Sequence, residues 1–142
     1  MVVQVVNAPG VRGPRVNTAV RIVAGLLLIA HGLVHLLYVI PEADDEKYPF
    51  TIRESWLVPE SVRRPAAIVL IATTILFFAL LGLAVWGVPG LSGAWPALTI
   101  IAASSSLALL IAFWDVRLTI GVAIDVALIV VALTRPGWTG VL

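Results

Sequence analysis

The sequence contains no cysteine and few charged residues. Without cysteine, the chain can form neither a disulfide bond nor a metal site with thiolate ligands. Lys, Arg, Asp and Glu make up 12% of the 142 residues, about half of the share that is typical of soluble domains. The net charge of +1 gives no basic surface for nucleic acid, and no phosphate-binding loop motif occurs. We therefore expect no nucleic-acid partner.

Apolar residues are present in excess. They make up 61% of the chain, and the mean hydropathy is +1.08. One water-soluble core cannot bury so much apolar surface, so we expect the chain to lie in a lipid bilayer. Fifty consecutive residues without a charge, from Pro65 to Trp114, are too many for one span of about 20 residues. The segment "GVPGLSGAWP", residues 87–96, divides this run, because proline and glycine end helices.

This pattern predicts an all-α integral membrane protein. We interpret residues 1–16, rich in proline and glycine, as a flexible tail, and residues 17–142 as one domain. Short links make consecutive spans antiparallel neighbours, which gives a four-helix bundle with both termini on one side. The expected spans are residues 20–40, 65–86, 95–114 and 118–134.

Tryptophan lies at the predicted ends of the spans, where its amphipathic ring prefers the headgroup region. Arg117, between the third and fourth spans, is interpreted as a further headgroup anchor. The tryptophans at these ends are Trp86, Trp95, Trp114 and Trp138.

Residues 41–64 form the main polar connection. This connection opens with the acidic "PEADDEKYP" and continues with "FTIRESWLVP", in which apolar residues stand among charges. Such a mixture predicts a short interfacial segment on the membrane surface with Trp56 turned inward. An ordinary loop with a few apolar contacts is the alternative.

Basic residues indicate the orientation of the spans. Arg12, Arg15 and Arg21 lie at or before the start of the first span, and acidic residues follow that span, which favours cytoplasmic termini. The total count favours the opposite, since five of the nine Lys and Arg residues lie on the other side. The first span usually dominates, so we expect the termini in the cytoplasm.

The only two histidines lie inside the apolar stretch "LLLIAHGLVHLLYVI", residues 26–40. Four residues apart on a helix, His31 and His35 share one face, about 6 Å apart along the axis. Because the fourth span runs antiparallel to the first, Asp125 lies at the depth of His31. Asp115 lies on the side where the first span ends. Depth therefore permits two pairs, His31 with Asp125 and His35 with Asp115.

Short polar runs lie near mid-depth in the two middle spans. Three successive serines sweep 200° of a helix, so at least one of them must face the bundle interior. Such hydroxyls often bond only to their own helix. We expect Gly32 and Gly121 to let the first and fourth spans approach closely. The polar runs are Thr73, Thr74, Ser104, Ser105 and Ser106.

Ionisable groups inside a bilayer are costly, which makes them candidates for a site. A metal is poorly supported, and Gly32 stands where a zinc peptidase needs glutamate. Two histidines on one helix cannot occupy both axial positions of one haem, although a single axial histidine is compatible with the pattern. A quinone headgroup fits, because His and Asp can bond its carbonyls and move its protons. A proton pathway would use the same residues, and a purely structural hydrogen bond is the remaining alternative.

The stretch "RIVAGLLLIAHGLVHLLY", residues 21–38, together with the four-span layout, resembles the DoxX-like group of small bacterial and archaeal membrane proteins. Those proteins begin with a basic residue and a glycine-containing first span, and a polar connection follows. The resemblance implies a prokaryotic plasma membrane. Some members of the group are linked to quinone-dependent sulfur oxidation. No catalytic residue can be carried over to this chain.

These observations lead to one principal hypothesis. We expect an accessory or anchor component that binds an apolar redox ligand, quinone-like or haem, around His31 and Asp125, or that supports a larger membrane complex. Its partners would be the bilayer and either other membrane subunits or further copies of the chain. The alternatives are an oligomeric minimal transporter or proton-coupled carrier that titrates Asp125, and a purely structural subunit. Whether the protein is an enzyme stays open.

Overall fold

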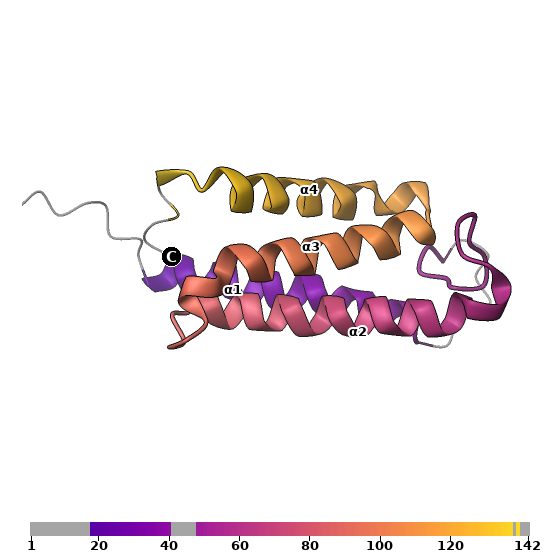
Figure 1. Cartoon of the computed structure of the whole chain (residues 1–142), viewed down its shortest axis with the longest axis horizontal. Coiled ribbons are helices and arrows are strands. Elements are labelled where there is room, and N and C mark those ends of the chain that lie inside the picture. The colour runs from indigo at the N-terminus through magenta and orange to yellow at the C-terminus, as the bar shows by residue number, and fades with distance from the viewer. Residues whose placement is uncertain (1–17, 41–47, 138, 140–142) are drawn as a thin grey trace, which may run out of the picture.

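A computed structural model describes residues 18–40, 48–137 and 139. All regular secondary structure in this part of the chain is helical (Figure 1). Four α-helices follow one another, and short 3₁₀ helices extend or precede three of them. The order is α1 (Thr18–Leu33), η1 (Val34–Tyr38), α2 (Glu60–Val85), η2 (Ser92–Ala94), α3 (Trp95–Ala112), η3 (Val116–Leu118) and α4 (Thr119–Thr134).

All four helical runs are long and apolar enough to cross a membrane. They cover Thr18–Tyr38, Glu60–Val85, Ser92–Ala112 and Val116–Thr134, so the four predicted spans are confirmed to within a few residues at most ends. The largest difference is at α2, which starts five residues before the predicted position because the helix continues through Pro65. Proline there removes one main-chain hydrogen bond but already has a helical φ. The protein is an integral membrane four-helix bundle.

Consecutive helices pack against each other in an antiparallel order. In Figure 1, α3 lies between α4 and α2, and the start of α1 lies at the same end of the molecule as the end of α4. α1 packs mainly on α2 and α4 mainly on α3, whereas α1 and α4 hardly contact each other. The bundle is therefore an open arc whose first and last helices face each other across a gap.

Glycines bring α1 close to α2. A Cβ atom added to Gly25 would lie 2.1 Å from Trp86 Nε1, and one added to Gly32 would lie 2.6 Å from Phe78 Cβ. Seven residues are nearly two full helical turns, so both glycines fall on the same face of α1. This face allows the two helices to pack at short range.

The expectation that Gly32 and Gly121 join the first and fourth spans is wrong. Gly32 faces Phe78 of α2, and the nearest atom to a Cβ on Gly121 belongs to Leu110 of α3. The two glycines therefore serve separate helix pairs. Because the small residues of α1 are used against α2, the backbone of α1 stays away from α4.

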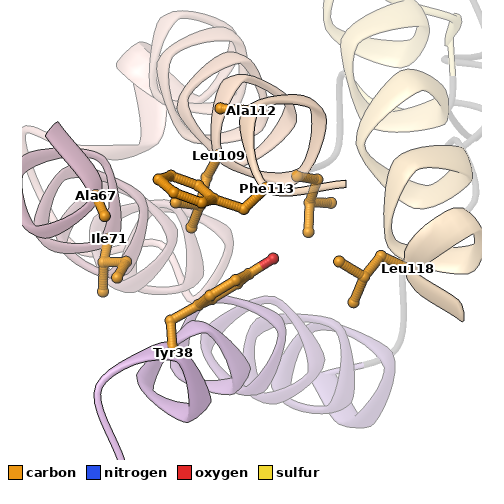
Figure 2. Packing of buried hydrophobic residues seen from close by; sticks show 8 residues of the cluster. Tyr38, Ala67, Ile71, Leu109, Ala112, Phe113 and Leu118 are labelled. Atoms are coloured by element: carbon orange, nitrogen blue, oxygen red, sulfur yellow. The ribbon is translucent and has the colours of Figure 1, made fainter. Parts of the chain in front are cut away.

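The interior at the η1 end of the bundle is a cluster of apolar side chains from all four helical runs. Figure 2 shows the ring of Tyr38 directed from η1 into this cluster. Its hydroxyl is buried and has no hydrogen-bond partner among residues 18–40, 48–137 and 139. The cluster consists of Tyr38, Ala67, Ile71, Leu109, Leu110, Ala112, Phe113 and Leu118.

The described part of the connection between α1 and α2 makes hydrogen bonds to the C-terminal end of α3. Ser55 Oγ donates to the carbonyl of Ala112 at 2.5 Å, and Trp56 Nε1 donates to that of Ile111 at 2.7 Å. These bonds satisfy carbonyls that a helix end leaves without partners. Trp56 is 71% exposed, so its ring lies outside the protein interior, while Phe50 packs against the Tyr38 cluster.

The other tryptophans in the described ranges stand at helix ends, as predicted. Trp86 is the residue after α2, Trp95 begins α3, and Trp114 follows α3 by two positions. Trp86 Nε1 also donates to the carbonyl of Ile22, which ties the start of α1 to the end of α2. Trp138, like the predicted tail 1–16, lies outside the described residues. Their contact with lipid headgroups stays a prediction.

Candidate ligand site between α1 and α4

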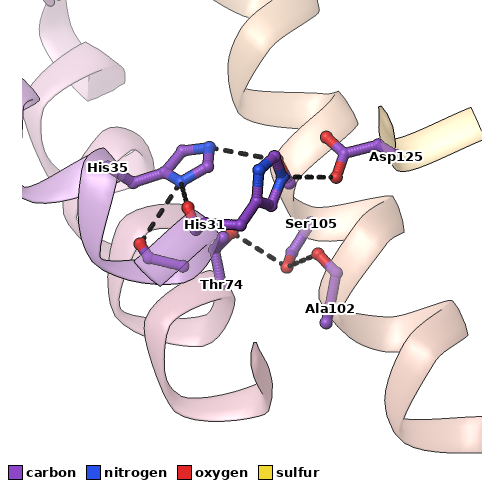
Figure 3. Close-up of polar contacts among 8 residues, drawn as sticks. His31, His35, Thr74, Ala102, Ser105 and Asp125 are labelled. Carbon is purple, nitrogen blue, oxygen red and sulfur yellow. Dashed lines mark hydrogen bonds and ion pairs between the residues drawn. The ribbon is translucent and has the colours of Figure 1, made fainter. Parts of the chain in front are cut away.

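His31 and Asp125 bridge the gap between the first and last helices. His31 Nε2 lies 3.0 Å from Asp125 Oδ1 (Figure 3). The side chain of Asp125 is fully buried, whereas that of His31 is 14% exposed. The proximity that their depths predicted is confirmed, although the helix backbones do not pack closely. The bridge therefore spans the gap through side chains alone.

The imidazole of His31 is held on one side by aromatic rings. Phe78 of α2 contacts it edge-on, with ring centroids 4.8 Å apart, and His35 lies 5.8 Å away in a similar T-shaped arrangement. Among the described residues, its second nitrogen, Nδ1, makes no hydrogen bond. That nitrogen is the atom through which His31 can bind a ligand.

Both ring nitrogens of His35 make hydrogen bonds within the bundle, unlike those of His31. Its Nδ1 lies 3.1 Å from the carbonyl of His31 and 3.3 Å from that of Gly32. Carbonyl oxygens only accept, so the Nδ1 atom carries a proton. In the neutral ring, Nε2 then accepts from the hydroxyl of Ser106 on α3, at 3.0 Å. His35 is 1% exposed and has both nitrogens engaged, so it positions the helices rather than a ligand.

The predicted pair of His35 with Asp115 is not formed. Asp115 Oδ1 accepts from the backbone N–H of Arg117 at 2.8 Å and so caps the short helix η3. A short polar side chain at a helix start commonly satisfies the backbone next to it. Because the carboxylate of Asp115 makes this local bond, it does not pair with His35, although depth alone permits that pair.

The polar runs of α2 and α3 meet in the bundle interior. Thr74 Oγ1 donates to Ser105 Oγ at 3.0 Å, and Ser105 Oγ donates to the carbonyl of Ala102 at 2.9 Å (Figure 3). The buried serine required by three successive positions is Ser106. Thr73 is half-buried and Ser104 is exposed toward the outside of the bundle.

An apolar groove runs along the outside of the His31–Asp125 bridge. Its volume is about 480 Å³. Histidine is the only polar residue among the side chains that line it, so an occupant would meet hydrocarbon walls and one imidazole. The lining residues are Leu27, Leu28, Ala30, His31, Val34, Ile124 and Leu128.

A second, smaller cavity of about 220 Å³ lies on the η3 side of His31. Phe50, which belongs to the polar connection, was not among the predicted site residues, and no sequence pattern links it to His31. Val34 and His35, which also line the cavity, follow His31 by three and four positions, and this helical spacing places them on the face of His31. The residues that line this cavity are His31, Val34, His35, Phe50, Leu110, Arg117, Leu118, Gly121 and Ile124.

The side-chain atoms available at the site favour a hydrogen-bonding ligand over a metal ion or haem. No group of three or more His, Asp or Glu side chains suited to a metal ion occurs among residues 18–40, 48–137 and 139. An axial haem ligand needs an accessible imidazole nitrogen. His35 offers none, and His31 offers only Nδ1. A ligand that accepts or donates one hydrogen bond at His31 fits better.

Comparison with protein-family models, curated proteins and solved structures finds no match to this chain. The class that the structure defines is an integral membrane four-helix bundle with a histidine–aspartate bridge between its outer helices. The resemblance to the DoxX-like proteins stays a prediction.

Proposed function

We propose that the protein binds a lipid-soluble, quinone-like ligand in the gap between α1 and α4, as a small accessory or anchor component of a membrane assembly. One observation carries this proposal. His31, held by the fully buried Asp125, lines both the apolar groove and the smaller cavity. Ligand sites are mostly apolar with a few placed polar groups, and this combination occurs here at mid-depth in the bundle.

The bridge can match both forms of a quinone. When Asp125 is a carboxylate, His31 Nε2 donates to it and Nδ1 is left as an acceptor for a quinol hydroxyl. When Asp125 is protonated, its O–H donates to Nε2, and Nδ1–H donates to a quinone carbonyl. The second state holds one more proton than the first and is neutral overall.

The short connections between the helices support an accessory role. The described connections between helices are short, apart from the segment before α2, and they build no second domain. A bound quinone would therefore exchange electrons with another subunit or with another protein of the membrane. The protein's contribution would be to hold the ligand and to move its proton.

The proposal is tested by what copurifies with the full chain in mild detergent. We expect organic extraction and mass spectrometry to recover a quinone with the wild-type protein, and to recover at least tenfold less with His31→Ala. Ser104→Ala, on the exposed side of α3, is the matched control and should retain the ligand. A ligand-free wild-type protein that also fails to bind added decyl-quinones in nanodiscs would contradict the proposal and leave the bridge as a structural bond.

A further inference from the structure

We infer that a cleft between Trp56 and Trp114, at the C-terminal end of α3, binds a phospholipid with an ethanolamine headgroup. The ammonium group of that headgroup would bond to the carboxylate of Glu54, and an acyl chain would lie over Ile111. None of these four residues lines the two hollows at His31. The inference therefore goes beyond the proposed function and does not depend on it.

The cleft has a polar part and an apolar part, and the same two tryptophans line both. The polar part is lined by Glu54, Ser55, Trp56 and Trp114. The apolar part is lined by Trp56, Ile111 and Trp114. Ile111 belongs to α3 and precedes Trp114 by three positions, so it lies nearer the middle of the third span. An occupant of both parts must be polar at the end of the span and apolar below it, as a phospholipid is.

The ring of Trp56 is held in place although it is 71% exposed. Its Nε1 donates to the carbonyl of Ile111 at 2.7 Å. The preceding residue, Ser55, donates through Oγ to the carbonyl of Ala112 at 2.5 Å, and the same oxygen accepts from the backbone N–H of Val58 at 2.9 Å. These bonds fix one wall of the cleft against α3 before a ligand arrives, which lowers the entropy lost on binding.

Two polar groups of the cleft have no partner in the described part of the chain. The carboxylate of Glu54 makes no hydrogen bond or ion pair there, and Nε1 of Trp114 makes no hydrogen bond. A carboxylate accepts hydrogen bonds, whereas an indole N–H only donates. An ammonium group suits the first, and a phosphate or ester oxygen suits the second. A phospholipid with an ethanolamine headgroup carries both kinds of group.

The carboxylate and the two rings favour ethanolamine over other headgroups. Cations bind over the faces of tryptophan rings, which suits both ethanolamine and choline. Choline has no N–H to donate to Glu54, whereas a primary ammonium group has three. A phosphoglycerol headgroup carries no cation, and its phosphate would meet a carboxylate of the same sign. The cleft therefore favours a primary ammonium group.

The experiment measures which lipid the full chain retains. The protein is placed in nanodiscs with equal amounts of phosphatidylethanolamine, phosphatidylcholine and phosphatidylglycerol that carry identical acyl chains, and native mass spectrometry identifies the lipid that stays bound. We expect phosphatidylethanolamine to be retained about fivefold more often than either other lipid. Glu54→Gln should abolish this preference. Glu60→Gln, which alters an exposed glutamate at the start of α2 outside the cleft, is the matched control and should keep it.

A second variant tests the aromatic wall. Trp114→Leu removes one ring from the cleft and should lower the retention of phosphatidylethanolamine about fivefold, while circular dichroism shows unchanged helix content. Equal retention of the three lipids by the wild type, an unchanged preference in Glu54→Gln, or full retention in a folded Trp114→Leu protein would overturn the inference. Preferential retention of phosphatidylcholine would overturn it as well, because the rings alone would then bind the cation.

Discussion

The bond between His31 and Asp125 does not repay the full cost of burying its partners. A central aspartate costs about 2.5–3.5 kcal/mol on membrane insertion, whereas a hydrogen bond between transmembrane helices contributes about 0.6–2 kcal/mol. Two leucines at these positions would avoid the cost altogether. We therefore expect the bundle to keep its stability when both residues are replaced by leucine, which is consistent with a role in ligand binding.

A double-mutant cycle tests this energy balance. His31→Leu leaves the carboxyl of Asp125 buried without its partner, so we expect the free energy of unfolding to fall by about 1–2 kcal/mol. Adding Asp125→Leu removes the stranded group, and stability should return to the wild-type value or exceed it. Unfolding in mixed micelles, followed by circular dichroism, measures both. Losses that simply add would show that the two side chains do not depend on each other.

At the level of single residues, sequence could predict the His31–Asp125 contact but not the partner of His35. The first contact follows from depth, since antiparallel spans bring their midpoints to one level. The partner of His35 depends on how far α3 is rotated about its axis, and three successive serines are compatible with several rotations. Packing selects Ser106. Asp115 was assigned wrongly because depth says nothing about its bond to the nearby backbone.

Among the helices, α1 and α2 pack closely through glycines. Charge and proline were sufficient to predict all four spans, because the bilayer requires a fixed length of apolar helix. Charge and proline could not predict which helix packs against the face of α1 that carries the glycines. That choice depends on side chains such as Phe78 and Trp86 that fit over the glycines.

Gly32→Ala should disturb this contact. The added methyl group would lie 2.6 Å from Phe78 Cβ, so the helices must separate, and we expect a loss of about 1–3 kcal/mol in the free energy of unfolding. Gly121→Ala is the matched control, because its methyl group meets only the end of Leu110 at 3.2 Å. Unfolding in the same micelles compares the two. Equal stability of both variants would show that α1 and α2 are packed less tightly than described.

The whole molecule is an arc with two inner and two outer helices. Half of the residues in the most apolar part of the third span are buried, against 17% in the first and fourth spans. The outer helices therefore leave most of their side chains uncovered by the rest of the bundle. Because their backbones hardly meet, we expect the His31–Asp125 bridge to control the width of the gap between them.

Distance measurements between spin labels test this control. The chain has no cysteine, so Leu27→Cys with Leu128→Cys places one label on each side of the gap without further changes. We expect a narrow distance distribution that broadens when Asp125→Leu removes the bridge. Labels at Leu76 and Ser104, on the exposed sides of α2 and α3, should give a distribution that Asp125→Leu leaves unchanged. An equally narrow distribution across the gap without Asp125 would contradict this description of the arc.

The bridge also joins two residues that are 94 positions apart in the chain. During biosynthesis, the imidazole of the first span enters the membrane long before the ribosome has made its counterpart. Until the last span arrives, His31 remains an unmatched polar group next to lipid. A truncated polypeptide that lacks α4 would keep this defect permanently, and quality-control proteases that sense polar groups in the bilayer could distinguish it from a finished one.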